Sequence, residues 1–149
     1  MGEPANLKFP PLASCACLNL RKTARAVTQA YDAELRRAGL RATQFSLLAT
    51  LAGRRPFRVT GLAEAMAMDP TTLSRNLRPL ERRGFVRIRQ GEDSRVREVS
   101  LTRRGEAAFR KALPFWERAQ GRIARALGKG RLRQLLLELA AAREVFQGA

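Results

Sequence analysis

The chain contains no histidine and only two cysteines among its 149 residues. Without histidine, Ser-His-Asp and Cys-His catalysis are excluded, and the commonest zinc ligand is missing. Cys15 and Cys17 are too few for a disulfide framework or a four-thiolate metal site. Glu64, Asp69 and Glu81 are typical of surface or capping positions rather than of a catalytic carboxylate pair. The sequence therefore predicts no enzyme, no metal site and no cofactor.

Long apolar runs are also absent. No segment approaches the length of a membrane span, and the first residues lack a charged stretch followed by an apolar run. We therefore expect a cytoplasmic protein with no membrane partner. Hydrophobic residues nevertheless make up 45% of the chain, which is enough for the core of one ordinary domain.

Acidic residues are few, since 13 Asp and Glu stand against 29 Lys and Arg, a formal net charge of +16. Almost all of the basic residues are arginine, whose planar guanidinium suits phosphate oxygens and guanine edges. This surplus favours a polyanionic partner, with nucleic acid first. The alternative is a GC-rich genome in which arginine replaces lysine throughout, which would give the same composition without such a partner.

The N-terminal part predicts an arm followed by a long helix. Residues 1–12 contain three prolines and little periodicity, so we expect an extended arm. From Cys15 onward, apolar residues recur at spacings of three and four, which predicts a helix that stops at Gly39. Thr43 is the expected N-cap of a second helix, which the glycine and proline of residues 53–56 close.

The middle of the chain alternates helical patterns with sharp breaks. A short helix is expected over residues 59–66. Asp69 is then suited to cap the next helix, and Pro70 fits its first turn because no backbone N–H is needed there. That helix is predicted over residues 71–83, and Pro79 inside it is expected to bend or distort its later half.

Beyond Gly84, which ends this helix, the pattern changes from helical to alternating. Residues 86–89 alternate between apolar side chains and arginine, and residues 98–101 alternate back. The polar stretch 91–94 between them is typical of a turn. Together these segments predict a β-hairpin with a polar, arginine-bearing tip.

Two helical stretches complete the chain, residues 102–127 with an expected kink at Pro114, and residues 131–146. Their apolar stripes need a partner surface. The predicted fold class is mainly α with a small β-hairpin wing. We expect three parts, namely an extended arm (1–12), a helical dimerisation region (13–38 and 102–149) and a winged helix-turn-helix DNA-binding domain (43–101).

The order of short helix, tight turn, second helix and basic hairpin is that of a winged helix-turn-helix. The helix after the turn is thin enough to enter the major groove of DNA with its N-terminal residues at the base edges. The hairpin tip suits an adjacent minor groove, where narrow A·T tracts concentrate negative potential. The candidate DNA-binding residues are Thr71, Thr72, Ser74, Arg75, Asn76 and Arg78 on the helix and Arg95 and Arg97 on the hairpin.

With these motifs the sequence resembles the MarR family of bacterial transcription regulators. The resemblance covers the chain from about Cys17 to its end. It rests on segments that occur in the family's order and spacing: 39–45 (GLRATQF), 68–77 (MDPTTLSRNL), 80–86 (LERRGFV), 93–95 (DSR) and 101–105 (LTRRG).

The resemblance implies several functional properties. The first helix and the last two would intertwine into an obligate homodimer, and Arg95 would enter the minor groove, steadied by Asp93. The dimer would read double-stranded DNA at a pseudopalindromic operator, with half-sites roughly 34–36 Å apart. It would act as a repressor that is released by a small molecule, often a phenolic acid, or by an oxidant.

One candidate for the releasing signal is oxidation of Cys15 or Cys17. Both stand at the start of the first helix, where the helix N-terminus and neighbouring Arg21 and Lys22 favour a thiolate. On one helix the two thiols would point to different sides, which argues against an intrachain disulfide. The alternative is that both are small buried residues in a reduced cytosol.

The resemblance bears on the same cysteines. Cys17 falls where the peroxide-sensing branch of the family keeps its reactive cysteine, and Tyr31 falls where a tyrosine partners it. The sequence departs from that branch at two further tyrosines, which are replaced here by Arg21 and Ala42.

The other candidate signal is a small aromatic or acidic ligand held between the dimer helices and the DNA-binding domain. Phe45, Tyr31 and Trp116 would line its pocket, with Arg21 or Arg25 anchoring a carboxylate. The alternative is that each aromatic residue belongs to the core.

Two functional classes thus remain for comparison. A sequence-specific regulator, located in the cytoplasm at the nucleoid, explains the order of elements and the placement of charge together. A non-specific nucleoid-type or RNA-binding protein would explain the charge, but it gives no reason for the apolar first and last helices.

Overall fold

The computed structural model describes residues 12–53, 56–93 and 95–147, so the expected arm over residues 1–12 lies outside the described residues except for Leu12. Helices and one three-stranded antiparallel sheet make up this part, which confirms the predicted fold class. The elements are η1 (Leu12–Ser14), α1 (Ala16–Leu35), η2 (Arg36–Ala38), α2 (Ala42–Leu51), β1 (Phe57–Arg58), α3 (Val59–Ala65), α4 (Pro70–Arg82), β2 (Val86–Gln90), β3 (Arg97–Leu101), α5 (Arg103–Leu127) and α6 (Lys129–Gln147).

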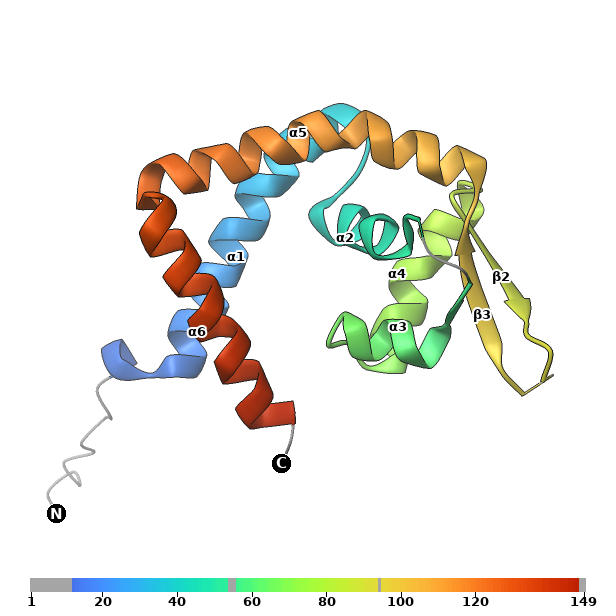
Figure 1. The fold of residues 1–149 in the computed structure, drawn as a ribbon, viewed down its shortest axis with the longest axis horizontal. Coiled ribbons are helices and arrows are strands. Elements are labelled where there is room, and N and C mark those ends of the chain that lie inside the picture. Colours follow the sequence, from blue (N-terminus) through green and yellow to red (C-terminus); the bar gives the residue numbers. More distant parts are fainter. Residues whose placement is uncertain (1–11, 54–55, 94, 148–149) are drawn as a thin grey trace, which may run out of the picture.

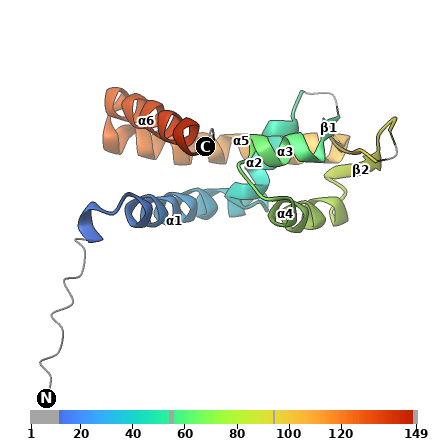
Figure 2. The ribbon, with the colours of Figure 1, turned by 90° about the horizontal axis from the view of Figure 1, so that it is seen from below.

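The terminal helices and the sheet lie at opposite ends of the molecule. Figures 1 and 2 show α1 and α6 projecting at one end and the β2–β3 hairpin, called the wing below, at the other. The long helix α5 joins the two ends and is bowed along its length (Figure 1). It continues through Pro114 as one helix, so the expected kink does not divide it.

One core holds α2, α3, α4 and the sheet together as a winged lobe, residues 42–101. The last turn of α1 and part of α5 also reach it, since Leu35 and Ala112 belong to the same cluster. Burial of a leucine side chain stabilises a fold by roughly 1.5–3 kcal/mol, so this cluster dominates the stability of the lobe. The fully buried side chains are Leu35, Leu40, Leu47, Leu48, Leu62, Leu73, Leu77, Leu80 and Val99.

Three helices end in the same kind of turn, with a residue of positive φ after the last helical turn. Gly39 (φ 74°) and Gly84 (φ 69°) occupy this position after η2 and α4, as the sequence predicted for both stops. In each turn the next residue donates to the carbonyl five residues back, as Leu40 does to Leu35 and Phe85 to Leu80. This pattern is the Schellman motif, which favours glycine because it has no Cβ.

The third turn has the same bonds but no glycine. Met68 donates to the Ala63 carbonyl (2.9 Å) and Ala67 donates to the Glu64 carbonyl (3.0 Å). Ala67 holds the positive φ, 49°, and is the only non-glycine residue in the described part of the chain to do so. The tight break between α3 and α4 is therefore made by an alanine in a conformation that costs an L-residue energy.

The prediction that Thr43 caps the second helix is wrong. Helix α2 begins at Ala42 with Arg41 as its N-cap, so Thr43 lies in the first turn. The Arg41 N–H donates to Gln44 Oε1 (3.0 Å), and the Ala42 N–H donates to Asp32 Oδ1 (2.7 Å). The carboxylate that satisfies this helix end therefore comes from α1, ten residues earlier in the chain.

Pro79 does not end α4. The helix continues past Pro79 to Arg82, and the Arg83 N–H still donates to the Pro79 carbonyl (3.2 Å). Pro79 lies in the last turn of α4. The Schellman bonds of residues 80–85 close the helix after it, and neither bond needs the backbone N–H that proline lacks. The other boundaries differ from prediction by a few residues, which is ordinary for helix ends.

The sheet has the order β1-β3-β2. The predicted hairpin pairs Val86 with Leu101 and Ile88 with Val99, which places the alternating apolar residues on one face. Strand β1, which the sequence analysis did not predict, adds Phe57 opposite Val99 on the other side of β3.

The described residues contain neither a helix suited to span a membrane nor a cluster of metal ligands. None of their helices is both long enough and apolar enough to cross a membrane. No three Cys, Asp or Glu side chains among them are grouped so that they could hold a metal ion.

Candidate nucleic-acid interface

The N-terminus of α4 is fixed by the residue just before it. Asp69 is the N-cap: its Oδ1 accepts from the Thr72 N–H (2.9 Å), and its Oδ2 accepts from the Thr72 hydroxyl (2.5 Å). These hydrogen bonds, the side-chain bond first, hold the pKa of Asp69 below its usual value. Pro70 occupies the first helical position, as predicted. The first turn of α4 therefore has a defined direction.

One face of α4 is buried and the opposite face is free. Leu73, Leu77 and Leu80 are at most 1% exposed and anchor the helix to the core. Among the predicted contact residues, Thr71, Arg75 and Arg78 are exposed, and Thr72, Ser74 and Asn76 are half-buried. Residues 71, 75 and 78 are spaced four and three apart, so they follow one stripe of the helix.

The wing tip is held by one carboxylate. Asp93 Oδ1 accepts from the Arg95 N–H (3.0 Å) and lies 3.6 Å from Arg95 Nε. The Arg95 side chain itself is 91% exposed. An ion pair this exposed adds little stability. The role in steadying Arg95 that the family resemblance implied for Asp93 stays a prediction.

The remaining wing arginines divide between the two faces of the hairpin. Arg97 is exposed and stands opposite Gln90 in the strand register. It lies on the same face of the hairpin as Ile88 and Val99, which are closer to the core. Arg87 and Arg89 are exposed on the opposite face and were not among the predicted site residues. The alternation with Val86 and Ile88 was the signal that could have identified these two cations as surface-facing.

The two cysteines occupy different environments at the start of α1. Cys15 is the N-cap, in extended backbone conformation, and its Sγ accepts from the Leu18 N–H (3.5 Å). Cys17 lies inside the first turn and is exposed. Both cysteines therefore stand at the start of α1, as predicted, with Cys15 just before its first residue.

The candidate ligand residues are only partly brought together. Phe45 is 5% exposed and stacks on Trp116, with ring centroids 5.9 Å apart. The Tyr31 hydroxyl donates to Gln120 Oε1, linking α1 to α5, and burial raises the pKa of Tyr31 above its usual value. Arg21 and Arg25 are exposed on α1, about 15 and 9 Å along the helix axis from Tyr31.

Together the fold and this surface define a winged helix-turn-helix protein. A family model described as the MarR family matches residues 40–97. In structure, the chain is similar to the transcriptional regulator MosR of Mycobacterium tuberculosis in complex with DNA. The two share 38% sequence identity, with a TM-score of 0.79 over 89% of this chain and 98% of that one. This chain belongs to the MarR family.

Other similar proteins agree on the class. An HTH-type transcriptional regulator of Bacillus cereus is 35% identical over 80 residues, 54% of this chain and 53% of that protein. The chain thus spans about half the length of the curated relatives it matches. The transcriptional repressor CouR bound to a DNA duplex has the same fold, with a TM-score of 0.80 at 23% identity over 93% of this chain and 99% of that one. These relatives are regulators, not enzymes.

Proposed function

We propose that this chain is a sequence-specific DNA-binding transcription regulator that acts as a homodimer. It works as a repressor at the nucleoid, in the cytoplasm, where a pseudopalindromic operator binds one winged lobe in each half-site. Helix α4 lies in the major groove, with Thr71, Arg75 and Arg78 toward the bases and phosphates. Arg95 at the wing tip enters the adjacent minor groove.

The observation that carries this proposal is the combination of a capped α4, buried on one face only, with an exposed arginine at the wing tip. Helix α4 has an exposed polar stripe opposite three buried leucines, and the exposed Arg95 pairs with Asp93. Support also comes from MosR, which is 38% identical and whose structure contains DNA. The formal charge of +16 suits a phosphate backbone.

The dimer is proposed from the distribution of exposed apolar side chains. In the described part of the chain, every exposed large hydrophobic residue lies at the terminal helices, none in the winged lobe. Such a concentration is typical of an interface between subunits. We expect sedimentation to give twice the monomer mass. These residues are Leu12, Leu18, Leu20 and Val27 in η1 and α1, and Leu135, Leu136, Leu137, Val145 and Phe146 in α6.

The experiment that tests DNA binding is a salt titration of affinity for the intergenic DNA upstream of the gene. Arg95→Ala should weaken binding and reduce the slope of log K against log salt by about 0.9 per protomer for one lost phosphate-equivalent contact. The matched control is Arg110→Ala, because Arg110 is an exposed arginine on α5 that already pairs with Glu106 at 2.6 Å. Equal slopes for Arg95→Ala and wild type would contradict the wing assignment.

Sequence specificity needs a second comparison. Affinity for the upstream fragment should exceed affinity for random DNA at the same salt concentration by at least 10³-fold, as is typical of specific regulators. Equal affinities would instead favour the non-specific nucleoid-type protein.

For the releasing signal we propose oxidation at the start of α1. Cys17 is exposed and Cys15 lies at the helix N-cap, whereas Phe45 and Trp116 are packed against one another. Peroxide should release wild-type protein from DNA, and Cys17→Ser should remain bound. If Cys17→Ser is released normally, the signal lies elsewhere, and a small aromatic or acidic ligand becomes the candidate.

A further inference from the structure

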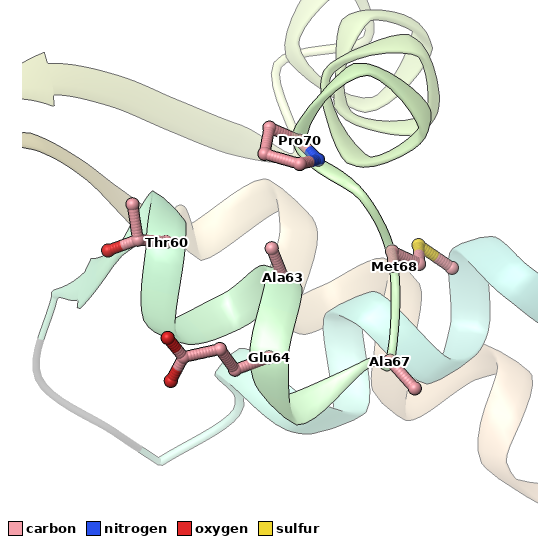
Figure 3. A pocket seen from close by; sticks show the side chains of 6 residues that line it. All are labelled: Thr60, Ala63, Glu64, Ala67, Met68 and Pro70. Atoms are coloured by element: carbon pink, nitrogen blue, oxygen red, sulfur yellow. The ribbon is translucent and has the colours of Figure 1, made fainter. Parts of the chain in front are cut away.

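Two of the chain's three methionines flank the strained residue of the turn between α3 and α4. Met66 and Met68 lie on either side of Ala67, whose φ is 49°. Met68 follows the positive-φ residue of a Schellman motif, a position whose apolar contact with the last helical turn commonly closes the turn. Here Met68 and Ala63 line one open pocket of about 490 Å³ (Figure 3).

The sulfur of Met68 also reaches the helix proposed to enter the major groove. Its Sδ accepts from Asn76 Nδ2 at 4.0 Å, and the same nitrogen donates to the Thr72 carbonyl at 2.9 Å. Asn76 is one of the predicted DNA-binding residues. The thioether therefore helps to orient a side chain on α4, across the turn.

Met68 is both accessible and part of the packing. Its side chain is half-buried, packs against the hydrophobic core and lines the pocket, which opens to solvent. Because the side chain is only half-buried, a small oxidant can reach it, and any polar group created there would lie against apolar neighbours. Oxidation converts a flexible apolar methionine into a polar one and disrupts such contacts.

We propose that Met68 is a site of reversible oxidation that weakens DNA binding. The regulatory consequence rests on the proposed function; the modification itself does not. The oxidant is hypochlorous acid. The thioether sulfur attacks the electrophilic oxidant and is oxidised by two electrons, and one S–O bond forms. The O–Cl bond of hypochlorous acid breaks, and chloride and a proton are the final products.

The sulfoxide changes the turn in two ways. Its oxygen is a stronger acceptor than the thioether sulfur and displaces the Asn76 amide from its present position. It also places a dipole against the hydrophobic core, which loosens the closed turn and the start of α4. We expect DNA affinity to fall at least fivefold and the thermal midpoint to fall by several degrees. Methionine sulfoxide reductases should restore both.

The test uses the full chain with Cys15→Ser and Cys17→Ser, so that thiol chemistry is removed. Three proteins with these two serines are treated with hypochlorous acid. The first keeps both methionines, the second carries Met68→Leu, and the third carries the matched control Met66→Leu. Each is compared with its own untreated sample. Peptide mass locates the added oxygen, fluorescence anisotropy with the upstream duplex measures affinity, and circular dichroism measures the thermal midpoint.

We expect the treated Met68→Leu protein to keep its DNA affinity and its thermal midpoint. The treated Met66→Leu and unsubstituted proteins should lose part of both. The proposal is overturned if Met68→Leu loses affinity and midpoint like the unsubstituted protein. It is also overturned if the Met68 peptide stays unmodified, or if its sulfoxide forms without either change. Should no untreated protein bind DNA, the proposed function fails, but the mass and midpoint measurements still decide whether Met68 is the sensitive site.

Discussion

The joint between the wing and α5 makes a sharp prediction about Gly105. A Cβ built on this glycine would lie 2.0 Å from the Phe85 carbonyl oxygen and 2.8 Å from Leu101 Cδ1. Real contacts of this kind are no shorter than about 3 Å, so the backbone of Phe85 and α5 must separate by about 1 Å. The obstacle is main chain, which cannot rotate away as the end of a side chain can.

That carbonyl is already engaged in the joint. Phe85 O accepts from the Thr102 N–H (3.0 Å) and from the Thr102 hydroxyl (3.1 Å), and the same hydroxyl oxygen caps α5 through the Gly105 N–H (3.0 Å). Overpacking costs about 1–3 kcal/mol, and a lost hydrogen bond about 1 kcal/mol. The gain of alanine over glycine within a helix returns about 0.5–1 kcal/mol. Gly105→Ala should therefore destabilise the protein by about 2 kcal/mol.

Thermal unfolding at one fixed protein concentration measures this change, because the midpoint of a dimer depends on concentration. A loss of about 2 kcal/mol should lower the midpoint by roughly 4–8 °C for a chain of this size. The matched control is Gly130→Ala in α6, where nothing lies within 4 Å of the new Cβ and φ is not positive. That variant should be slightly more stable than wild type. A Gly105→Ala midpoint at or above that of wild type would refute the packing argument.

Two further stability predictions concern the turn before α4. Ala67→Gly should raise the free energy of unfolding by about 0.5–1 kcal/mol, since glycine relieves the positive φ; a lower midpoint in urea would contradict this. The pKa of Asp69 is lowered in the folded state. The ionised Asp69 carboxylate therefore stabilises the fold at pH values above its ordinary pKa of 3.8, and this stabilisation is lost as pH falls through the folded pKa. Asp69→Asn keeps an N-capping side chain without that carboxyl, so its stability should change less between pH 5 and pH 2 than that of wild type, measured by chemical unfolding at each pH.

Local signals predicted the winged lobe well because its key residues determine the conformation of neighbours only a few positions away in the sequence. Asp69 caps the helix that starts at the next residue, and Gly39 and Gly84 supply the positive φ that their turns require. The alternation from Val86 to Leu101 set the register of the hairpin. Each of these signals depends on backbone geometry that the neighbouring residues already determine.

The predictions failed where distant segments meet. The start of α2 is satisfied in part by Asp32 from α1, which no local pattern reveals, and Thr43 was chosen although Gln44 is the local residue that bonds to the Arg41 N–H. Ala67 was missed because alanine carries no preference for positive φ; the fold imposes it. Strand β1 is two residues long, too short for any periodicity. Likewise, the sequence marked Phe45 and Trp116 as aromatic but could not show that their rings stack.

The connections between the two ends of the molecule limit how a signal can reach DNA. The last turn of α1 belongs to the core through Leu35, and Asp32 bonds to α2. Arg83, just after α4, donates to the Gly39 carbonyl at 2.8 Å. The far end of α1, at Cys17, lies about 22 Å along the helix axis from Asp32. Because α1 is one continuous helix, we expect a change at Cys17 or at the proposed dimer contact to be transmitted along it to the winged lobe. In the proposed dimer such a change would alter the distance between the two winged lobes, and hence their fit to two half-sites.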